Sequence, residues 1–165
     1  MTVPGERDEA KLALIETLKH FPEALAAETA GLTEAVLHYR PAEGEWSINE
    51  VVAHCWFAED VWYRRLYQVW SLTDPVLMGW SGEDVWLQQV YDAPDLRPYL
   101  DELATRRGRT VDLLSNAIDW SRTGQWLGEG RRSFKQLAAY LVSHDAGHLT
   151  QVRALKEAQT VARLP

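Results

Sequence analysis

The stretch "SHDAGHLTQV" (residues 143–152) places His144, His148 and Gln151 at spacings of four and three residues. In an α-helix these spacings bring the three side chains onto one face. Alternating spacings of three and four continue along this face through Phe134, Leu137, Leu141, His144, His148, Gln151 and Leu155. Such a seam is typical of a helix that packs in a bundle, with its seam turned to the core. Because a buried polar group without a partner costs about 1–3 kcal/mol, we expect the polar groups to be satisfied there.

Two capping boxes mark the starts of two helices. Ser133 is followed three residues later by Gln136, so the helix that carries the polar seam should begin here and continue to about residue 158. Ser47 and Glu50 form the other box, which predicts a helix through about residue 70.

Apolar periodicity predicts two further helices. The first covers about residues 6–30, with Pro22 expected to kink or split it and Gly31 to end it. The other covers about residues 95–117, with Pro98 in its first turn. Their apolar stripes are Leu14, Leu18, Phe21 and Leu25 in the first, and Leu100, Leu103, Val111, Leu114 and Ile118 in the second.

The connecting segments show no convincing strand. Residues 71–93 are rich in turn formers and include a candidate short helix at 83–91, and residues 119–132 are predicted to be a loop. The sequence therefore predicts an all-α four-helix bundle, as a single domain over residues 1–165 without any sheet. The long connection between the second and third helices means that the topology need not be simply up-down-up-down.

Charge and cysteine content exclude several classes of protein. The formal net charge of the 165-residue chain is −7, and the basic clusters "RRGR" at 106–109 and "RR" at 131–132 are short, and we assign them to loops or helix surfaces. No nucleic-acid partner is therefore expected. The single cysteine permits no internal disulfide, and neither a signal peptide nor a membrane span is evident, so we expect a cytoplasmic protein without a membrane partner.

A divalent metal ion would satisfy the polar seam economically. Histidines four residues apart on a helix can bind one ion, and the zinc-protease motif HExxH is absent because Asp145 follows His144. His54 is the candidate third ligand, since it lies on the core-facing stripe of the helix over 47–70 with Val51, Ala58 and Val61. Three histidines leave coordination positions open for water or substrate, as in catalytic sites.

Other polar and aromatic residues receive more ordinary roles. His20 and His38 are expected at the surface or in loops, Glu59 and Asp60 on a solvated face, and Cys55 as a small buried side chain. Gln151 and Glu50 are candidates to support the ligands by hydrogen bonds, although for Glu50 we favour the capping box alone. The eight tryptophans either fill the core and a dimer surface or form an aromatic wall around a substrate entrance.

The segments "RPAEGEWSINEVVAHCWFAED" (40–60) and "LAAYLVSHDAGHLTQVRAL" (137–155) together resemble the DinB/YfiT-like superfamily. The similarity spans nearly the whole chain, with both motifs in the expected order. It implies a four-helix bundle with a metal site made by His54, His144 and His148. Zinc, nickel or another divalent ion and a homodimer are further implications of this resemblance.

The resemblance also suggests a reaction, because some members of the superfamily are metal-dependent transferases of low-molecular-weight thiols of the bacillithiol or mycothiol class. We therefore expect a thiol S-transferase acting on a small-molecule substrate, since a metal-bound thiol ionises readily and the thiolate is the nucleophile. Arg or Trp residues near the entrance would hold the substrate, with no particular residue assigned. One alternative is a metal-dependent hydrolase, for which Asp145 and Glu50 are weak candidates as general base. The other is a non-catalytic metal-binding or dimeric interaction protein.

Overall fold

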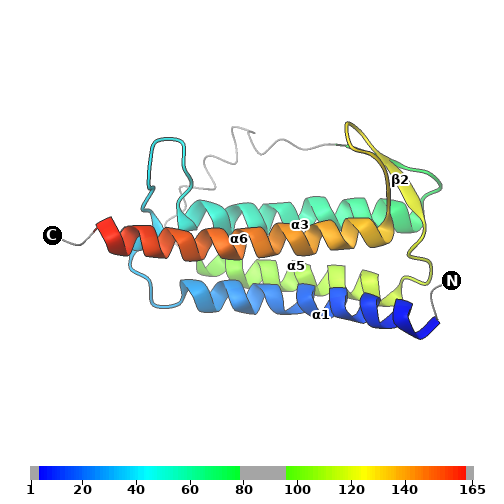
Figure 1. Cartoon of the computed structure of the whole chain (residues 1–165), viewed down its shortest axis with the longest axis horizontal. Coiled ribbons are helices and arrows are strands. Elements are labelled where there is room, and N and C mark those ends of the chain that lie inside the picture. Colours follow the sequence, from blue (N-terminus) through cyan, green and yellow to red (C-terminus); the bar gives the residue numbers. More distant parts are fainter. Residues whose placement is uncertain (1–3, 79–95, 163–165) are drawn as a thin grey trace.

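Four long helices form the predicted bundle in the computed structural model, which describes residues 4–78 and 96–162 (Figure 1). The elements in chain order are α1 (Pro4–Thr29), α2 (Glu34–Leu37), α3 (Ile48–Ser71), β1 (Val76–Leu77), α5 (Arg97–Asn116), β2 (Thr123–Trp126), β3 (Gly130–Ser133) and α6 (Phe134–Ala162). The short helix expected at 83–91 lies outside the described residues.

The order of the helices around the bundle is α1, α5, α3, α6. Helices α1 and α3 each pack against both α5 and α6, and therefore lie diagonally opposite one another. The neighbours α3 and α5 run in the same direction, as do α1 and α6 (Figure 1). Since α3 ends at one end of the bundle and α5 begins at the other, the chain needs the long connection that the sequence predicts. The topology is thus not up-down-up-down.

Local sequence signals account for the helix ends. Ser47 accepts a hydrogen bond from the backbone N–H of Glu50, whose carboxylate accepts one from the N–H of Ser47, so the predicted capping box starts α3. Ser133 and Gln136 exchange the equivalent pair of bonds at the start of α6. Pro22 lies within α1 without splitting it, and Pro98 occupies the first turn of α5, where the missing N–H costs nothing.

The prediction of no sheet is wrong. Strands β1, β2 and β3 form a small sheet in that order, with β1 parallel and β3 antiparallel to β2. Residues 119–132, predicted to be a loop, thus contain most of this sheet at the end of the bundle (Figure 1). At Gly124 a Cβ atom would approach the carbonyl oxygen of Pro75 to 3.0 Å, so glycine permits β1 and β2 to lie together.

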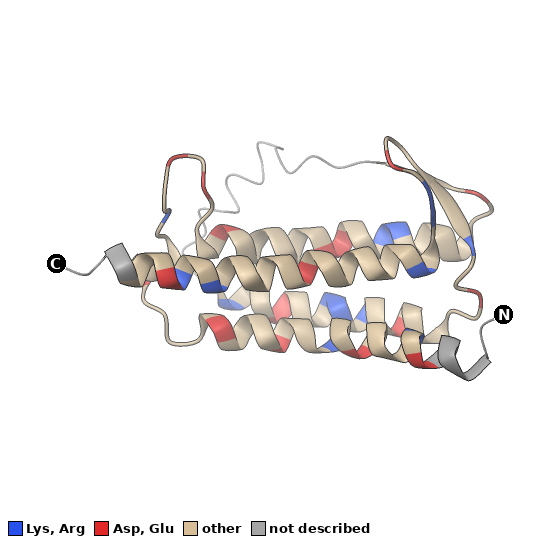
Figure 2. Cartoon of the chain, in the orientation of Figure 1, with Lys and Arg blue, Asp and Glu red and all other residues tan. Residues whose placement is uncertain are grey.

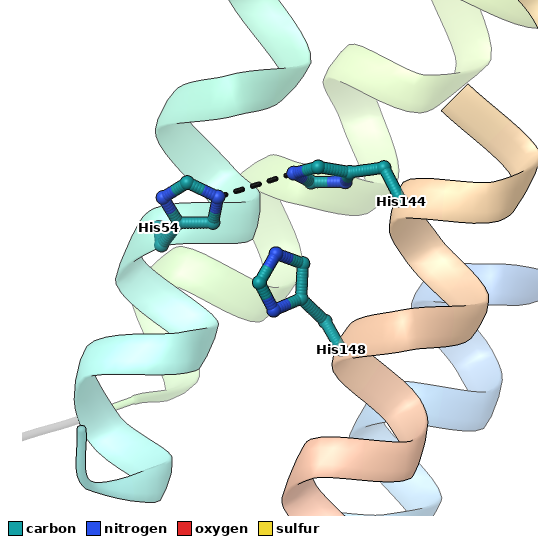
Figure 3. Close-up of side chains that lie close together, drawn as sticks. All are labelled: His54, His144 and His148. Carbon is teal, nitrogen blue, oxygen red and sulfur yellow. Dashed lines mark hydrogen bonds between the residues drawn. The ribbon is translucent and has the colours of Figure 1, made fainter. Parts of the chain in front are cut away.

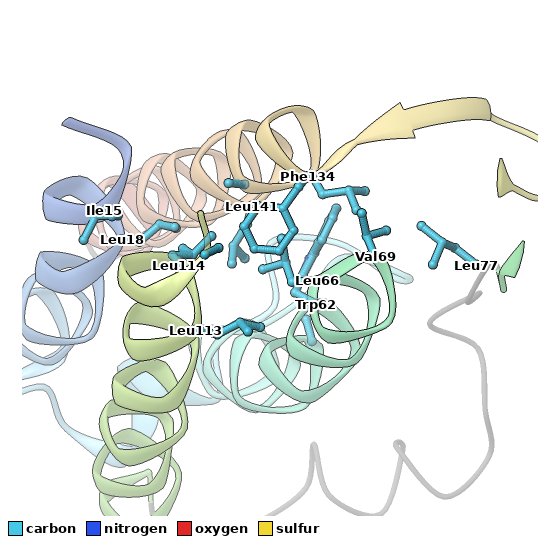
Figure 4. Packing of buried hydrophobic residues seen from close by; sticks show 14 residues of the cluster. Ile15, Leu18, Trp62, Leu66, Val69, Leu77, Leu113, Leu114, Phe134 and Leu141 are labelled. Carbon is cyan, nitrogen blue, oxygen red and sulfur yellow. The ribbon is translucent and has the colours of Figure 1, made fainter. Parts of the chain in front are cut away.

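Two apolar clusters fill the bundle, one toward each end. The first contains Leu66, Phe134 and Leu141, with other residues of all four helices and Leu77 of β1 (Figure 4). The second contains Leu25 and Val51 among its members. On α3, α5 and α6 a belt of buried or partly buried polar residues lies between the two clusters, and this belt holds the predicted metal ligands.

Charge is dispersed along the bundle. Figure 2 shows basic and acidic residues interspersed along the long helices rather than segregated onto separate helices. Among the described helices, none is long and apolar enough to cross a membrane.

Candidate metal centre

The three predicted ligands come together between α3 and α6. His54 on α3 faces His144 and His148, which lie one turn apart on α6 (Figure 3). Each offers one ring nitrogen, and these three atoms lie within 4.8 Å of one another. Nε2 of His54 lies 3.1 Å from Nε2 of His144. His54 is buried, and the other two are partly buried.

The environment disfavours a proton on two of these imidazoles, His54 and His148. Burial, followed by the proximity of His148 and His144, lowers the pKa of His54 to about 3. Burial and His144 likewise lower the pKa of His148, although hydrogen bonding to Gln151 and the charge of Asp145 partly oppose this. A neutral imidazole presents a lone pair, which is the form that binds a metal ion.

Hydrogen bonds to the far side of two rings orient their lone pairs. Nδ1 of His148 lies 2.9 Å from Oε1 of Gln151, and Nδ1 of His144 lies 3.3 Å from Oδ1 of Asp145. Nδ1–H groups that donate these bonds leave each Nε2 atom available to an ion. Carboxylate or amide partners of this kind commonly fix the tautomer of metal-binding histidines. Gln151 therefore occupies the supporting position that the sequence suggested.

The arrangement fits a divalent ion of the zinc type. Two ligand nitrogens at about 2.0–2.1 Å from a tetrahedral ion are separated by about 3.3 Å, close to the 3.1 Å between His54 and His144. Three imidazoles without a thiolate or a carboxylate also suit nickel and related ions. Within the described residues, the metal-ligand cluster contains these three histidines alone, one fewer than the four ligands that a tetrahedral ion takes.

Trp46 adds an aromatic contact to this cluster. Its ring centroid lies 4.9 Å from that of His54, and its ring stacks on that of His148 with the centroids 6.3 Å apart. Trp46 immediately precedes the capping box at the start of α3. The helix start therefore fixes both the tryptophan and, two turns later, the histidine beneath it.

A buried ionic network lies beside the three histidines. Arg107 of α5 donates through Nε and Nη2 to Oε2 of Glu59 on α3, at 2.8 and 2.6 Å. Its Nη1 donates to Oδ2 of Asp145 on α6 at 2.6 Å and to the carbonyl of Leu18 on α1 at 2.9 Å. Thr110 donates to the other oxygen of Glu59. Arg107 thus connects all four long helices.

The network corrects two predictions. Glu59 was expected on a solvated face and Arg107 at a helix surface, yet the structure leaves them only 1% and 2% exposed. Although burial alone lowers the pKa of Arg107, the two carboxylates outweigh it and raise this pKa. One guanidinium between two carboxylates leaves the network with a formal charge of −1, which favours a cation nearby.

The network also reaches the candidate metal centre through Asp145. One oxygen of its carboxylate accepts from Arg107 and the other faces Nδ1 of His144. Arg107 therefore fixes the group that orients a predicted metal ligand. The sequence does not predict this role, because its only signal is a polar residue directly after His144.

A cavity of about 280 Å³ adjoins two of the histidines. It is lined by His54, His144, Ala58, Val61, Trp62, Arg65, Trp126, Leu127 and Glu129. Two tryptophans lie in its wall, which fits the aromatic wall that the sequence leaves open as one of two roles for the tryptophans. Trp62 comes from α3, but Trp126 comes from β2, a strand that the sequence analysis did not predict.

Four other residues, His20, His38, Cys55 and Glu50, have the structural or surface roles that the sequence suggests. His20 and His38 are exposed, with 66% and 41% of their side chains accessible. Cys55 is buried, and burial raises the pKa of its thiol well above the usual range. Glu50 uses Oε2 in the capping box and Oε1 in an ion pair with Arg40, so these hydrogen bonds give it a capping role rather than one beside the histidines.

Comparisons with known proteins agree with this architecture. The family model described as the DinB superfamily matches residues 17–152. Among solved structures, YfiT from Bacillus subtilis, described as a probable metal-dependent hydrolase with an unusual four-helix bundle topology, is similar with a TM-score of 0.85. The two share 19% sequence identity over 96% of this chain and 91% of that chain, a likeness that establishes the fold. A comparison with curated protein sequences finds no match.

Proposed function

The chain belongs to the DinB superfamily, and from this premise we propose that it is a metal-dependent transferase of a low-molecular-weight thiol. The observation that carries the proposal is the convergence of His54, His144 and His148 beside a cavity with aromatic walls. Such a site offers a divalent ion three imidazole ligands and offers a small molecule access to it. Zinc and nickel are the ions we propose.

The chemistry that the ion supplies is a lowered pKa for a bound thiol, which makes thiolate available at neutral pH. The residues of the chain contribute position and charge. Neutral imidazoles leave the full positive charge of the ion to favour an anionic sulfur. Asp145 and Gln151 hold the rings of His144 and His148 in place. Apolar groups such as Trp62 and Val61 limit the water around the reacting atoms.

A metal-dependent hydrolase is the second candidate, and the likeness to YfiT supports it. Hydrolysis through a bound water usually calls for a general base close to the ion. Asp145 has its two oxygens engaged with Arg107 and His144, while Glu50 has its own engaged with Ser47 and Arg40. Because both candidate bases are occupied, we rank thiol transfer above hydrolysis.

A non-catalytic metal-binding or dimeric interaction protein is the third candidate. A fourth protein ligand that closed the coordination shell would favour it, and no such ligand belongs to the cluster among residues 4–78 and 96–162. The homodimer and the cytoplasmic location expected from the sequence stay predictions.

The test compares the two reactions on protein loaded with zinc or nickel. Purified chain is incubated with bacillithiol or mycothiol and the electrophile monochlorobimane, and thioether formation is followed by fluorescence. Hydrolysis of 4-nitrophenyl acetate without thiol is followed by absorbance. We expect metal-dependent thioether formation that His144→Ala abolishes and His20→Ala retains. Metal-dependent ester hydrolysis without thioether formation would favour the hydrolase, and failure of both reactions would favour the non-catalytic protein.

A further inference from the structure

Arg65 is a buried arginine in the wall of the cavity beside the histidines. It lies on α3, three helical turns after His54, and is only 7% exposed. Its guanidinium carbon lies 5.1 Å from the ring centroid of Trp62 and 4.5 Å from that of Trp126. The guanidinium thus lies against both indoles, an arrangement that holds its plane in place.

Among the described residues, Arg65 differs from the buried Arg107 in having no counter-ion. Within the part of the chain that the structure describes, no carboxylate forms an ion pair with Arg65. Its Nη2 donates to the carbonyl of Met78 at 3.1 Å, while Nε is buried without an acceptor among the described residues. Burial lowers the pKa of this guanidinium. A buried charge without a counter-ion is costly, which is why most buried arginines are paired.

The cavity supplies the space for an anionic partner. At about 280 Å³ it has room for a small molecule, and its lining is mostly apolar between Arg65 and the histidines. A molecule in this space would meet a cation at one end and the candidate metal centre at the other, with indole and aliphatic groups between. This distribution of groups selects a ligand with an apolar middle and an anionic end.

We propose that Arg65 binds a carboxylate of the substrate, which the cavity holds with its other end directed toward His54 and His144. The inference rests on the proposed function only for the reaction at that other end of the substrate. Binding of the carboxylate by Arg65 does not depend on that reaction. A planar carboxylate suits the fork of a guanidinium.

A monoanion fits this cavity better than a phosphate dianion. Glu129 also lines the cavity, and its carboxylate lies 3.6 Å from the guanidinium of the partly buried Arg132. A second negative charge on the ligand would add repulsion from Glu129 without adding another buried cation.

The test uses 4-phenylbutyrate and its neutral amide, 4-phenylbutyramide, as a matched pair of probes. Binding of each to the full chain is measured by isothermal titration calorimetry, first with zinc present and then after treatment with a chelator. We expect the acid to bind at least about tenfold more tightly than the amide in both states, because charge-assisted hydrogen bonds are the strong ones. Arg65→Gln should abolish this preference, and Arg65→Lys should retain part of it. Inorganic phosphate should compete weakly.

Arg64→Gln is the matched control, because it removes an equal charge from the neighbouring position, which is exposed and outside the cavity lining. It should keep the preference for the acid, and circular dichroism of every variant establishes that it is folded. Equal binding of acid and amide, no binding of either, or an unchanged preference in Arg65→Gln would each overturn the proposal. Tighter binding of inorganic phosphate than of 4-phenylbutyrate would also overturn it.

The chelated arm separates this proposal from the proposed function. If the histidines bind no metal, thiol transfer fails, yet the preference for the acid over the amide persists. If Arg65 does not bind carboxylates, the preference is lost, yet metal binding and thiol transfer to an uncharged electrophile persist.

Discussion

Nε2 of His54 lies 3.1 Å from Nε2 of His144, although the two residues are 90 positions apart in the sequence. There is room for at most one proton between these two facing nitrogens, and with His148 the rings place three ligand nitrogens around one point. The packing of α3 against α6 creates this proximity. A divalent ion placed between His54 and His144 would bind both Nε2 atoms and so replace their direct contact.

The first prediction concerns metal binding by these histidines. Zinc or nickel should raise the melting temperature of the wild type, because binding to the folded state stabilises it by mass action. Replacement of His54, His144 or His148 by alanine should greatly weaken this effect, as measured by thermal shift and by elemental analysis of the native protein. His20→Ala and His38→Ala are the controls, since both residues are exposed away from the cluster. Equal responses in the wild type and the three ligand variants would show that the metal, if bound, lies elsewhere.

Local sequence signals made much of this centre predictable. The capping boxes at Ser47 and Ser133 fix where α3 and α6 begin, and the spacing of His144 and His148 places both on the inner face of α6. His54 follows from the apolar periodicity of α3 in the same way. Each of these inferences needs only residues within a few turns of one helix.

Features that depend on distant pairing were not predictable. Val76 pairs with Gln125, so the strands form through a contact across the chain rather than through a strong local pattern. The burial of Glu59 likewise depends on Arg107, 48 positions away on another helix. Ile118 was assigned to an apolar stripe but is 98% exposed, because α5 ends two residues before it and the helical periodicity no longer applies.

The second prediction tests the support of a ligand by Gln151. Gln151→Leu removes the acceptor for Nδ1 of His148 but leaves the three histidines in place. We expect a loss of zinc affinity of about 10- to 100-fold, the usual effect of removing such a partner. Competition titration with a chromophoric chelator measures it. Gln68→Leu, which removes an amide from α3 outside the metal-ligand cluster, should leave the affinity unchanged. An unaltered affinity in Gln151→Leu would contradict the role assigned here.

The third prediction concerns the buried ionic network. Arg107→Met leaves the carboxylates of Glu59 and Asp145 buried without their cation. The free energy of unfolding should fall by about 3–5 kcal/mol, the typical cost of breaking a buried pair. Urea denaturation followed by circular dichroism measures this change.

Arg109→Met provides the comparison for Arg107→Met. Arg109 lies two residues further along the same helix and forms an exposed ion pair with Asp60 at 3.3 Å. Its replacement should cost no more than about 1 kcal/mol. Similar losses in the two variants would mean that the network contributes little to stability.

The last prediction is a dependence of stability on pH in the metal-free protein. The pKa of His54 is about 3 in the folded state and about 6.5 in an unfolded chain. Between these values the unfolded state binds the proton more readily, so stability falls as the pH decreases from about 6.5 toward 3. The lowered pKa of His148 acts in the same direction. Each such histidine contributes at most about 1.4 kcal/mol per pH unit.

Urea denaturation of the chelated protein at about pH 7 and about pH 5 tests this dependence, which follows from the linkage of proton binding to folding. The wild type should lose more stability between the two pH values than His54→Asn, which lacks the titrating group but keeps a smaller polar side chain. Every other titratable residue is present in both proteins, so the difference between the two losses reports on His54. Added zinc should steepen the dependence in the wild type, because protons compete with the ion for the imidazoles. Equal losses in the two metal-free proteins would mean that His54 takes up its proton at the same pH whether the chain is folded or not.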